Sequence, residues 1–193
     1  KGLRCIINES DRLNHLVIEL LELAKTSSNK FSYTFTDLNL SELIRETGDE
    51  MMIKAKKYNI SIHCSAEEEL RLRGDRDRLK EVLINLLDNA IKYGHVNSVI
   101  EIRAGRQQEL IWVSIQDQGP GIPEELRQRV FDPFFRVDPK ASRESGSAGL
   151  GLTIVKEIIE KHNGSVEIKS RPGCGTEVIL RFTGGVGGAA WNE

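Results

Sequence analysis

The strongest hydrophobic pattern in the chain lies between residues 79 and 93. Apolar side chains recur there three and four positions apart, the spacing of one buried helix face: Leu79, Val82, Leu83, Leu86, Leu87, Ala90 and Ile91. A second stripe on the same helix is polar and consists of Glu81, Asn85, Asn89 and Lys92. Because a buried amide without a partner costs about 1–3 kcal/mol, this stripe either faces solvent or meets a polar ligand. Amides and a lysine facing a cavity would suit hydrated Mg²⁺ and phosphate oxygens.

Shorter patterns divide the rest of the chain into strands and helices. Alternating apolar residues predict strands at 31–35, 60–64, 70–73, 99–104, 110–115, 166–168 and 178–182. Helical spacing predicts helices at about 40–57, from Pro123 to about Phe131, and at 150–162. Asn39 and Asp75 are the expected N-caps of the helices that follow them. Residues 137–148 have no apolar period, and we expect a functional loop there.

The N-terminal segment carries a heptad seam between residues 3 and 24. Its positions alternate by three and four: Leu3, Ile6, Ser10, Leu13, Val17, Leu20 and Ala24. The wider apolar surface favours a helix of a dimeric bundle over a helix folded back on its own domain. The chain begins inside this pattern and without Met, so we expect it to be a piece of a longer protein. His15 lies beside the seam, and we interpret it as structural.

Composition narrows the classes of partner. The 193 residues are 39% hydrophobic and 29% charged, with a formal net charge of −2. Nothing therefore indicates nucleic-acid binding, and an anion site must be local. Cys5, Cys64 and Cys174 are scattered, which argues against a disulfide framework or a zinc site and fits a reducing compartment. No apolar run approaches the roughly 20 residues of a membrane span, so we expect no membrane contact by this part of the chain.

Two glycine-containing segments are candidate ligand contacts. Asp117 ends a predicted strand and is followed by Gly119 and Gly121. The backbone there can approach a flat ligand while the carboxylate accepts an exocyclic amine, such as that of adenine. The same pattern is also a common turn. Residues 146–152 place glycines at the start of a helix, where free N–H groups bind anions, but they fit neither a Walker A loop nor a Rossmann fingerprint.

Taken in order, these motifs resemble the catalytic and ATP-binding domain of bacterial sensor histidine kinases, in the wider group shared with gyrase B and the Hsp90 chaperones. The resemblance covers roughly residues 33–182. It implies a two-layer α/β sandwich of the Bergerat type, with a mixed sheet backed by helices and preceded by a bundle or coiled-coil helix. The implied division is residues 1–26 for part of the second dimerisation helix, 27–32 for a linker, 33–183 for the ATP-binding domain and 184–193 for a flexible tail.

The resemblance also implies roles for single residues. The segment from Asn85 to Tyr93 is similar to the family's N box, in which Asn89 would bind Mg²⁺ and its neighbours would lie near the phosphates or the ribose. Asp117 would read adenine, supported by Thr176. The expected catalytic residues are Asn85, Lys92 and Arg136. The other implied pocket residues are Tyr93, Gly119, Gly121, Ile122, Phe131 of the F box, and Gly149, Leu150, Gly151 and Leu152 of the second glycine box.

One difference from the related hydrolases concerns Asn85. A glutamate stands at that position in the hydrolases and activates water, whereas an amide cannot act as a general base at neutral pH. We therefore expect MgATP to be bound without efficient hydrolysis, which leaves its γ-phosphate for another nucleophile. The resemblance implies that this nucleophile is a histidine. The resemblance places that histidine on a first dimerisation helix that this chain lacks, so His15 is not assigned as the acceptor.

The resemblance further implies a homodimer formed through the N-terminal helix, a response-regulator receiver domain as partner, and a cytoplasmic location beneath a membrane-anchored bacterial sensor. Ser147 and Ala148 depart from the Gly-Thr that is frequent in the family, which changes the hydroxyl contacts available from the lid. Two other interpretations stay open. A protein-serine kinase of the anti-sigma-factor type shares the N box and the glycine boxes but needs no bundle helix. A non-catalytic signalling module is the other, although intact Asn89, Asp117 and glycine boxes argue against it.

Overall fold

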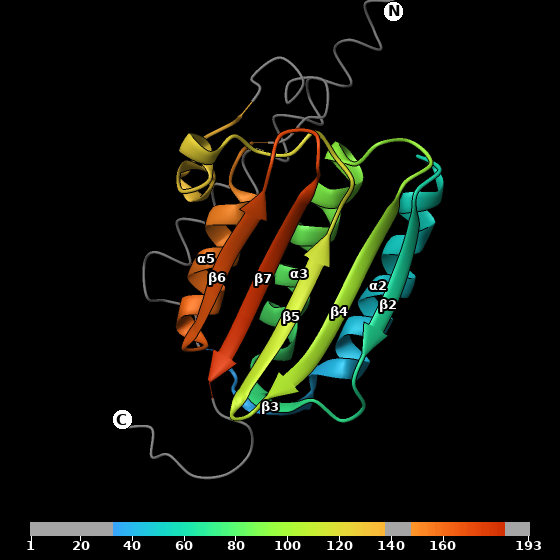
Figure 1. Ribbon diagram of the computed structural model, residues 1–193. Coiled ribbons are helices and arrows are strands. Elements are labelled where there is room, and N and C mark those ends of the chain that lie inside the picture. The colour runs from blue at the N-terminus through green and yellow to red at the C-terminus, as the bar shows by residue number, and fades with distance from the viewer. Residues whose placement is uncertain (1–32, 138–147, 184–193) are drawn as a thin grey trace, which may run out of the picture.

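The computed structural model describes residues 33–137 and 148–183 (Figure 1). The helix predicted at 3–24, the linker at 27–32, the tail at 184–193 and most of the loop at 137–148 lie outside the described residues. In chain order the elements are β1 (Thr36–Asn39), α2 (Leu40–Lys56), β2 (Ser61–Ala66), β3 (Arg71–Gly74), α3 (Arg76–Tyr93), β4 (Val99–Gln107), β5 (Leu110–Gln116), the 3₁₀ turns η1 (Glu124–Leu126) and η2 (Arg129–Phe131), α5 (Gly151–Lys161), β6 (Gly164–Ser170) and β7 (Thr176–Thr183).

The main sheet has five strands in the order β2-β4-β5-β7-β6. The β2 and β4 strands are parallel and the other neighbours are antiparallel. Figure 1 shows α2, α3 and α5 covering one face of this sheet, with α3 in the middle. The predicted two-layer sandwich with a mixed sheet is confirmed. A separate antiparallel pair is formed by β1 and β3.

The apolar face of α3 forms the centre of the core. All seven of its apolar residues predicted to be buried are buried, and Val82 and Leu87 are fully enclosed. The helix begins where predicted, because the Asp75 carboxylate accepts hydrogen bonds from the backbone N–H groups of Asp77 and Arg78, both at 3.1 Å. This cap fixes where α3 starts and therefore which of its side chains face away from the core.

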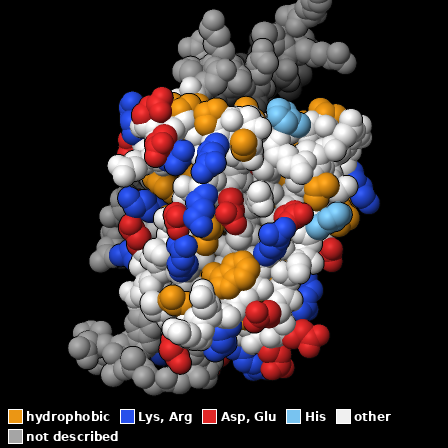
Figure 2. Space-filling model, viewed as in Figure 1, with side chains coloured by type: hydrophobic (Ala, Val, Ile, Leu, Met, Phe, Trp, Pro, Cys, Tyr) orange, Lys and Arg blue, Asp and Glu red, His pale blue; other side chains and the backbone are white. Residues whose placement is uncertain are grey.

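The other face of the sheet is polar. Figure 2 looks onto this face, where acidic and basic side chains are interspersed. Arg181 and Glu167 form an ion pair of 2.7 Å across β7 and β6, and Arg103 pairs with Glu101 on β4. Since antiparallel sheets commonly leave one face to water, this face needs no covering layer. No helix in the described ranges is both long and apolar enough to cross a membrane.

Two sequence predictions were wrong. Residues 33–35 are not a strand, because Thr34 donates its N–H to the Asp75 carboxylate at 2.8 Å instead of joining a ladder. The helix expected from Pro123 to Phe131 is only the two turns η1 and η2. Val130 is the single buried side chain of those turns, and a segment without an apolar face gains too little from packing to hold a longer helix.

Candidate functional site

A cavity of about 240 Å³ opens between α3, the segment that follows β5, the start of α5 and the strands β6 and β7. Much of the predicted set lines it: Asn89, Tyr93, Asp117, Gly121, Ile122, Arg136, Gly149, Gly151, Leu152 and Thr176. Asn85, Lys92, Gly119, Phe131 and Leu150 belong to the predicted set but do not line the cavity. The structure thus brings together residues separated by almost ninety positions in the sequence.

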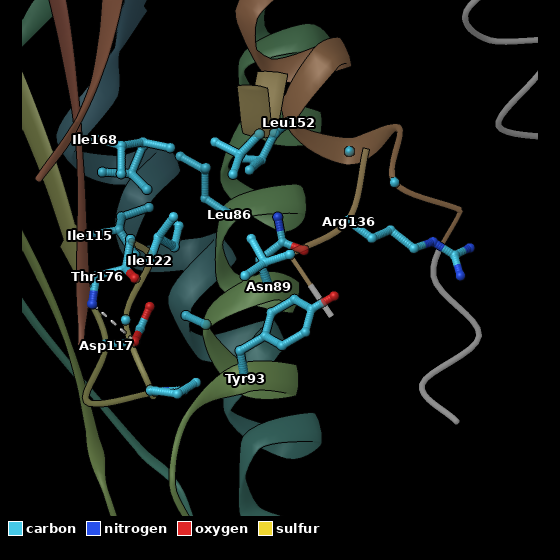
Figure 3. A pocket seen from close by; sticks show the side chains of 18 of the residues that line it. Leu86, Asn89, Tyr93, Ile115, Asp117, Ile122, Arg136, Leu152, Ile168 and Thr176 are labelled. Carbon is cyan, nitrogen blue, oxygen red and sulfur yellow. Dashed lines mark hydrogen bonds between the residues drawn. The ribbon is translucent and has the colours of Figure 1, made fainter. Parts of the chain in front are cut away.

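Asp117 lies at the base of this cavity, with its carboxylate pointing into it (Figure 3). Its Oδ1 atom accepts hydrogen bonds from the N–H groups of Gly119 at 2.7 Å and Thr176 at 3.2 Å. No hydrogen bond reaches Oδ2 from the described residues. Burial raises the pKa of Asp117, and the two backbone hydrogen bonds and the nearby His95 oppose that rise only in part. One oxygen is therefore fixed, while the other is an acceptor that faces the cavity.

The loop after Asp117 is held against the β6–β7 turn by Ser170. The Ser170 hydroxyl accepts from the N–H of Ile122 at 2.8 Å and donates to the carbonyl of Gly175 at 2.7 Å. The Thr176 hydroxyl lies 3.0 Å from the same oxygen. Sequence reasoning missed Ser170, because a serine at the end of a predicted strand carries no signal of its own.

An apolar row forms one wall of the cavity. Ile115 of β5 is paired with Val178 of β7, which is paired in turn with Ile168 of β6. All three line the cavity, and Leu86 of α3 and Leu152 of α5 line it too (Figure 3). Sequence reasoning missed Leu86, Ile115, Ile168 and Val178, although Ile115 stands two residues before Asp117 and so shares its strand face. A predominantly apolar wall with a few polar groups is typical of small-molecule and cofactor sites.

The polar stripe of α3 is divided among different partners. Asn89 and Tyr93 reach the cavity from this helix (Figure 3). Asn85 lies beside Gly151 at the start of α5. Glu81 pairs with Arg78 at 2.8 Å, and the Lys92 ammonium pairs with Asp88 at 2.6 Å. The stripe is therefore not a uniformly solvated face, and Lys92 reaches a carboxylate rather than the cavity.

The start of α5 forms the opposite end of the cavity. No side chain caps this helix within the described residues, so its first N–H groups can receive an anion. The carbonyl of Gly149, just before the helix, accepts a hydrogen bond from the N–H of Phe134 at 3.0 Å, which ties the F-box segment, residues 131–136, to the helix start. Leu150 is a fully buried core residue.

The three phenylalanines of residues 131–136 lie in three different settings. Phe135 lines the cavity. The Arg129 guanidinium, which is not part of the cavity lining, lies 4.5 Å from the centre of the Phe135 ring. The carbonyl of Phe131 accepts from the hydroxyl of Thr153 at 3.0 Å. Phe134 is 52% exposed. Arg136 extends from the same segment away from Asp117 (Figure 3).

Metal-binding groups at the cavity are few. No group of three or more His, Cys, Asp or Glu side chains suitable for a metal ion occurs in residues 33–137 and 148–183. The amide oxygen of Asn89 is a hard ligand that suits Mg²⁺. Asn89 could therefore hold a magnesium ion together with water and the oxygens of a bound phosphate.

Comparisons with known proteins agree on one family for this chain. Residues 74–184 match the family described as histidine kinase-, DNA gyrase B-, and HSP90-like ATPase. The sensor-like histidine kinase SenX3 of Mycobacterium tuberculosis is 34% identical over 175 residues, which cover 91% of this chain and 43% of SenX3. The chain spans less than half the length of the curated relatives it matches.

Solved structures agree with this assignment. The catalytic domain of the histidine kinase ThkA superposes with a TM-score of 0.69 at 37% identity, covering 78% of this chain and 96% of that domain. ThkA in complex with the response regulator TrrA gives a TM-score of 0.74 at 36% identity, covering 93% of this chain and 49% of ThkA. The chain belongs to the histidine kinase-, DNA gyrase B- and HSP90-like ATPase family, and its described part is a catalytic domain of the sensor histidine kinase type.

Proposed function

We propose that this chain is the ATP-binding catalytic part of a two-component sensor histidine kinase, which passes the γ-phosphate of MgATP to a histidine outside this sequence. One observation carries the proposal. Asp117 presents a single open carboxylate oxygen at the base of an apolar cavity, while two backbone N–H groups hold its other oxygen. An acceptor in that setting suits the exocyclic amine of adenine, and the row from Ile115 to Ile168 suits the flat base.

The other end of the cavity suits the phosphates. The uncapped start of α5 offers N–H groups to an anion, and Asn89 would hold Mg²⁺. The ion would neutralise phosphate charge, the main requirement of phosphoryl transfer. Lys92, Arg136 and Asn85 would complete the phosphate contacts. Asn85 cannot take a proton from water, so this arrangement favours transfer to a better-placed nucleophile over hydrolysis.

The partners follow from the same proposal. A structure of ThkA with the response regulator TrrA supports a receiver domain as the protein to which phosphate is finally transferred. Pairing of two copies through the segment before residue 33 would bring the catalytic part to a histidine of a dimerisation helix. Because the reaction consumes ATP, this part of the protein would work on the cytoplasmic side of a bacterial membrane.

Titration calorimetry with ATP and with GTP, with and without Mg²⁺, tests the adenine site. We expect saturable ATP binding that Asp117→Asn weakens about 10- to 100-fold, because a hydrogen bond to a charged group contributes about 1.5–3 kcal/mol. GTP should bind the wild type poorly, since its base presents an oxygen where Asp117 needs a donor. The matched control is Asp132→Asn, which alters an exposed acid outside the cavity.

Two outcomes would contradict the proposal. A folded wild type that does not bind ATP at millimolar concentration would refute the nucleotide site altogether. Equal ATP affinity in the wild type and Asp117→Asn would refute the adenine role of Asp117. For Mg²⁺, Asn89→Ala should abolish the difference between titrations with the ion and with EDTA, and a difference that persists would remove Asn89 as its ligand.

A further inference from the structure

Asp88 of α3 is held by two lysines that come from different helices. Its Oδ2 atom lies 2.6 Å from the ammonium of Lys92, one turn further along α3. Its Oδ1 atom accepts from the ammonium of Lys54, which reaches across from α2. Asp88 and Lys92 are only 20% and 23% exposed. We call these three residues the ion triad.

The ion triad reverses the charge pattern of the seam between α2 and α3. Earlier along the seam the acid stands on α2 and the base on α3, as in Glu46 with Arg76 and Glu50 with Lys80. At the third position the lysine stands on α2 and the aspartate on α3. Because α3 also supplies Lys92 at this position, Asp88 pairs with two lysines, whereas Glu46 and Glu50 each pair with one base.

The charges of the triad are unequal. The single carboxylate of Asp88 faces the two ammonium groups of Lys54 and Lys92, one on each of its oxygens. If one lysine leaves, the carboxylate still has a partner, whereas a half-buried carboxylate left with none is costly.

Of the two lysines, Lys92 is the one that a ligand in the cavity could draw away from Asp88. It lies three residues after Asn89 on the same stripe of α3 and next to Tyr93, both of which line the cavity, yet it does not line the cavity while it is paired with Asp88. We propose that Lys54 is a positioning residue for nucleotide binding, because it neutralises Asp88 and so allows Lys92 to exchange Asp88 for a polyphosphate. This inference rests on the proposed function, since it requires phosphates at that end of the cavity.

If Lys54 acts through Lys92, substitutions in the ion triad should change the affinity only for ligands that carry phosphate. A purely structural ion pair would not produce this difference. Lys54→Met leaves Asp88 with Lys92 alone, so ATP should bind about two- to fivefold more weakly, the range expected for one partly exposed ion pair. Asp88→Asn releases Lys92, and ATP should bind about two- to fivefold more tightly. Adenosine has no phosphate, and its affinity should be the same in all variants. Lys54→Arg should restore ATP binding.

A double-mutant cycle separates this mechanism from a general loss of positive charge. In the Asp88→Asn background, Lys54→Met should no longer change ATP affinity, because the carboxylate through which it acts is gone. Lys80→Met is the matched control, since it removes another lysine of the same seam about 18 Å along α3 from Lys92. Titration calorimetry gives the affinities, and thermal unfolding verifies that each variant is folded.

The outcomes distinguish this inference from the proposed function. A wild type that binds ATP, with Lys54→Met and Asp88→Asn both unchanged, overturns the role of the triad alone. Equal losses for ATP and adenosine, or a Lys54→Met effect that persists with Asp88→Asn, likewise overturn it. A folded wild type that fails to bind ATP refutes the proposed function itself.

Discussion

Asp117 holds one carboxylate oxygen against two backbone N–H groups and turns the other toward the cavity. The sequence could identify this residue because an acid at a strand end before Gly-x-Gly is a local pattern. It could not identify Ser170, Lys54 or Asp88 as parts of the same region. Their roles arise from contacts between elements that lie far apart in the sequence, and no local spacing encodes such contacts.

At the residue scale, we predict that Asp117→Asn stabilises the ligand-free protein. Burial raises the pKa of Asp117, so the native state keeps this proton over a pH window in which the unfolded chain has lost it. Above that window the buried charge lowers the free energy of unfolding. This destabilisation is lost as pH falls through the native pKa. An asparagine oxygen can accept the same two hydrogen bonds without the charge.

Thermal unfolding at pH 7 tests this prediction, and a gain of ~1 kcal/mol would appear as a Tm about 2–4 °C higher. The same comparison near pH 3.5 should give a smaller difference, because Asp117 is then largely protonated. A variant that is less stable than the wild type at pH 7 would show that the charge itself is needed to hold the loop after β5.

At the element scale, periodicity predicted the helices that bury a broad face and failed where packing is sparse. The patterns of α2, α3 and α5 agree with the structure within one or two residues. The segments at 33–35 and 124–131 have aromatic and capping signals of the right kind. Residues 33–35 pair with no neighbouring strand among the described residues, and residues 124–131 bury no apolar face, so neither segment forms the regular element predicted for it.

A second prediction concerns His162, at the C-terminal end of α5. This buried residue follows α5, and its Nε2 accepts from the N–H of Asp75 at 3.0 Å, while its Nδ1 donates to the carbonyl of Ile158 at 2.7 Å. The ring of Phe35 lies 4.9 Å from its own. Burial lowers the pKa of His162 below its ordinary 6.5, opposed in part by the hydrogen bond to Ile158 and the charge of Asp75.

Because its native pKa is lowered, the unfolded chain binds a proton to His162 more readily than the native state does. The stabilisation is complete above pH 6.5 and is lost as pH falls from 6.5 toward the native pKa. Urea unfolding between pH 5 and 7.5 should therefore show a free energy of unfolding that rises with pH, and His162→Gln should flatten this slope. His63→Gln, at an exposed position on β2, is the control that should retain it. An unchanged slope in His162→Gln would assign the pH dependence to other groups.

At the scale of the whole molecule, the strand order had to come from the family resemblance or from the structure. The alternation along each strand is local, but the parallel pairing of β2 with β4 and the place of β7 between β5 and β6 are not. This order aligns Ile115, Val178 and Ile168 in one row and sets Asp117 beside Thr176. The cavity is thus a product of topology, while its polar residues are marked by local motifs.

Substitution of Gly121 tests how closely the loop after β5 packs against the β6–β7 turn. It has a φ of +74°, and a Cβ atom there would lie 2.0 Å from the carbonyl oxygen of Arg171 in the β6–β7 turn. Gly173 has a similar φ of +78°, but a Cβ atom there would meet nothing within 4 Å. Both Gly→Ala variants lose about 1–2 kcal/mol of unfolding free energy from the left-handed backbone, so the difference between them isolates the contact between the two segments.

We expect Gly121→Ala to be the less stable of the pair in urea unfolding and to bind ATP more weakly, because the turn must move away from Asp117. Equal stability and equal affinity in the two variants would mean that the loop after β5 and the β6–β7 turn can separate without disturbing the site.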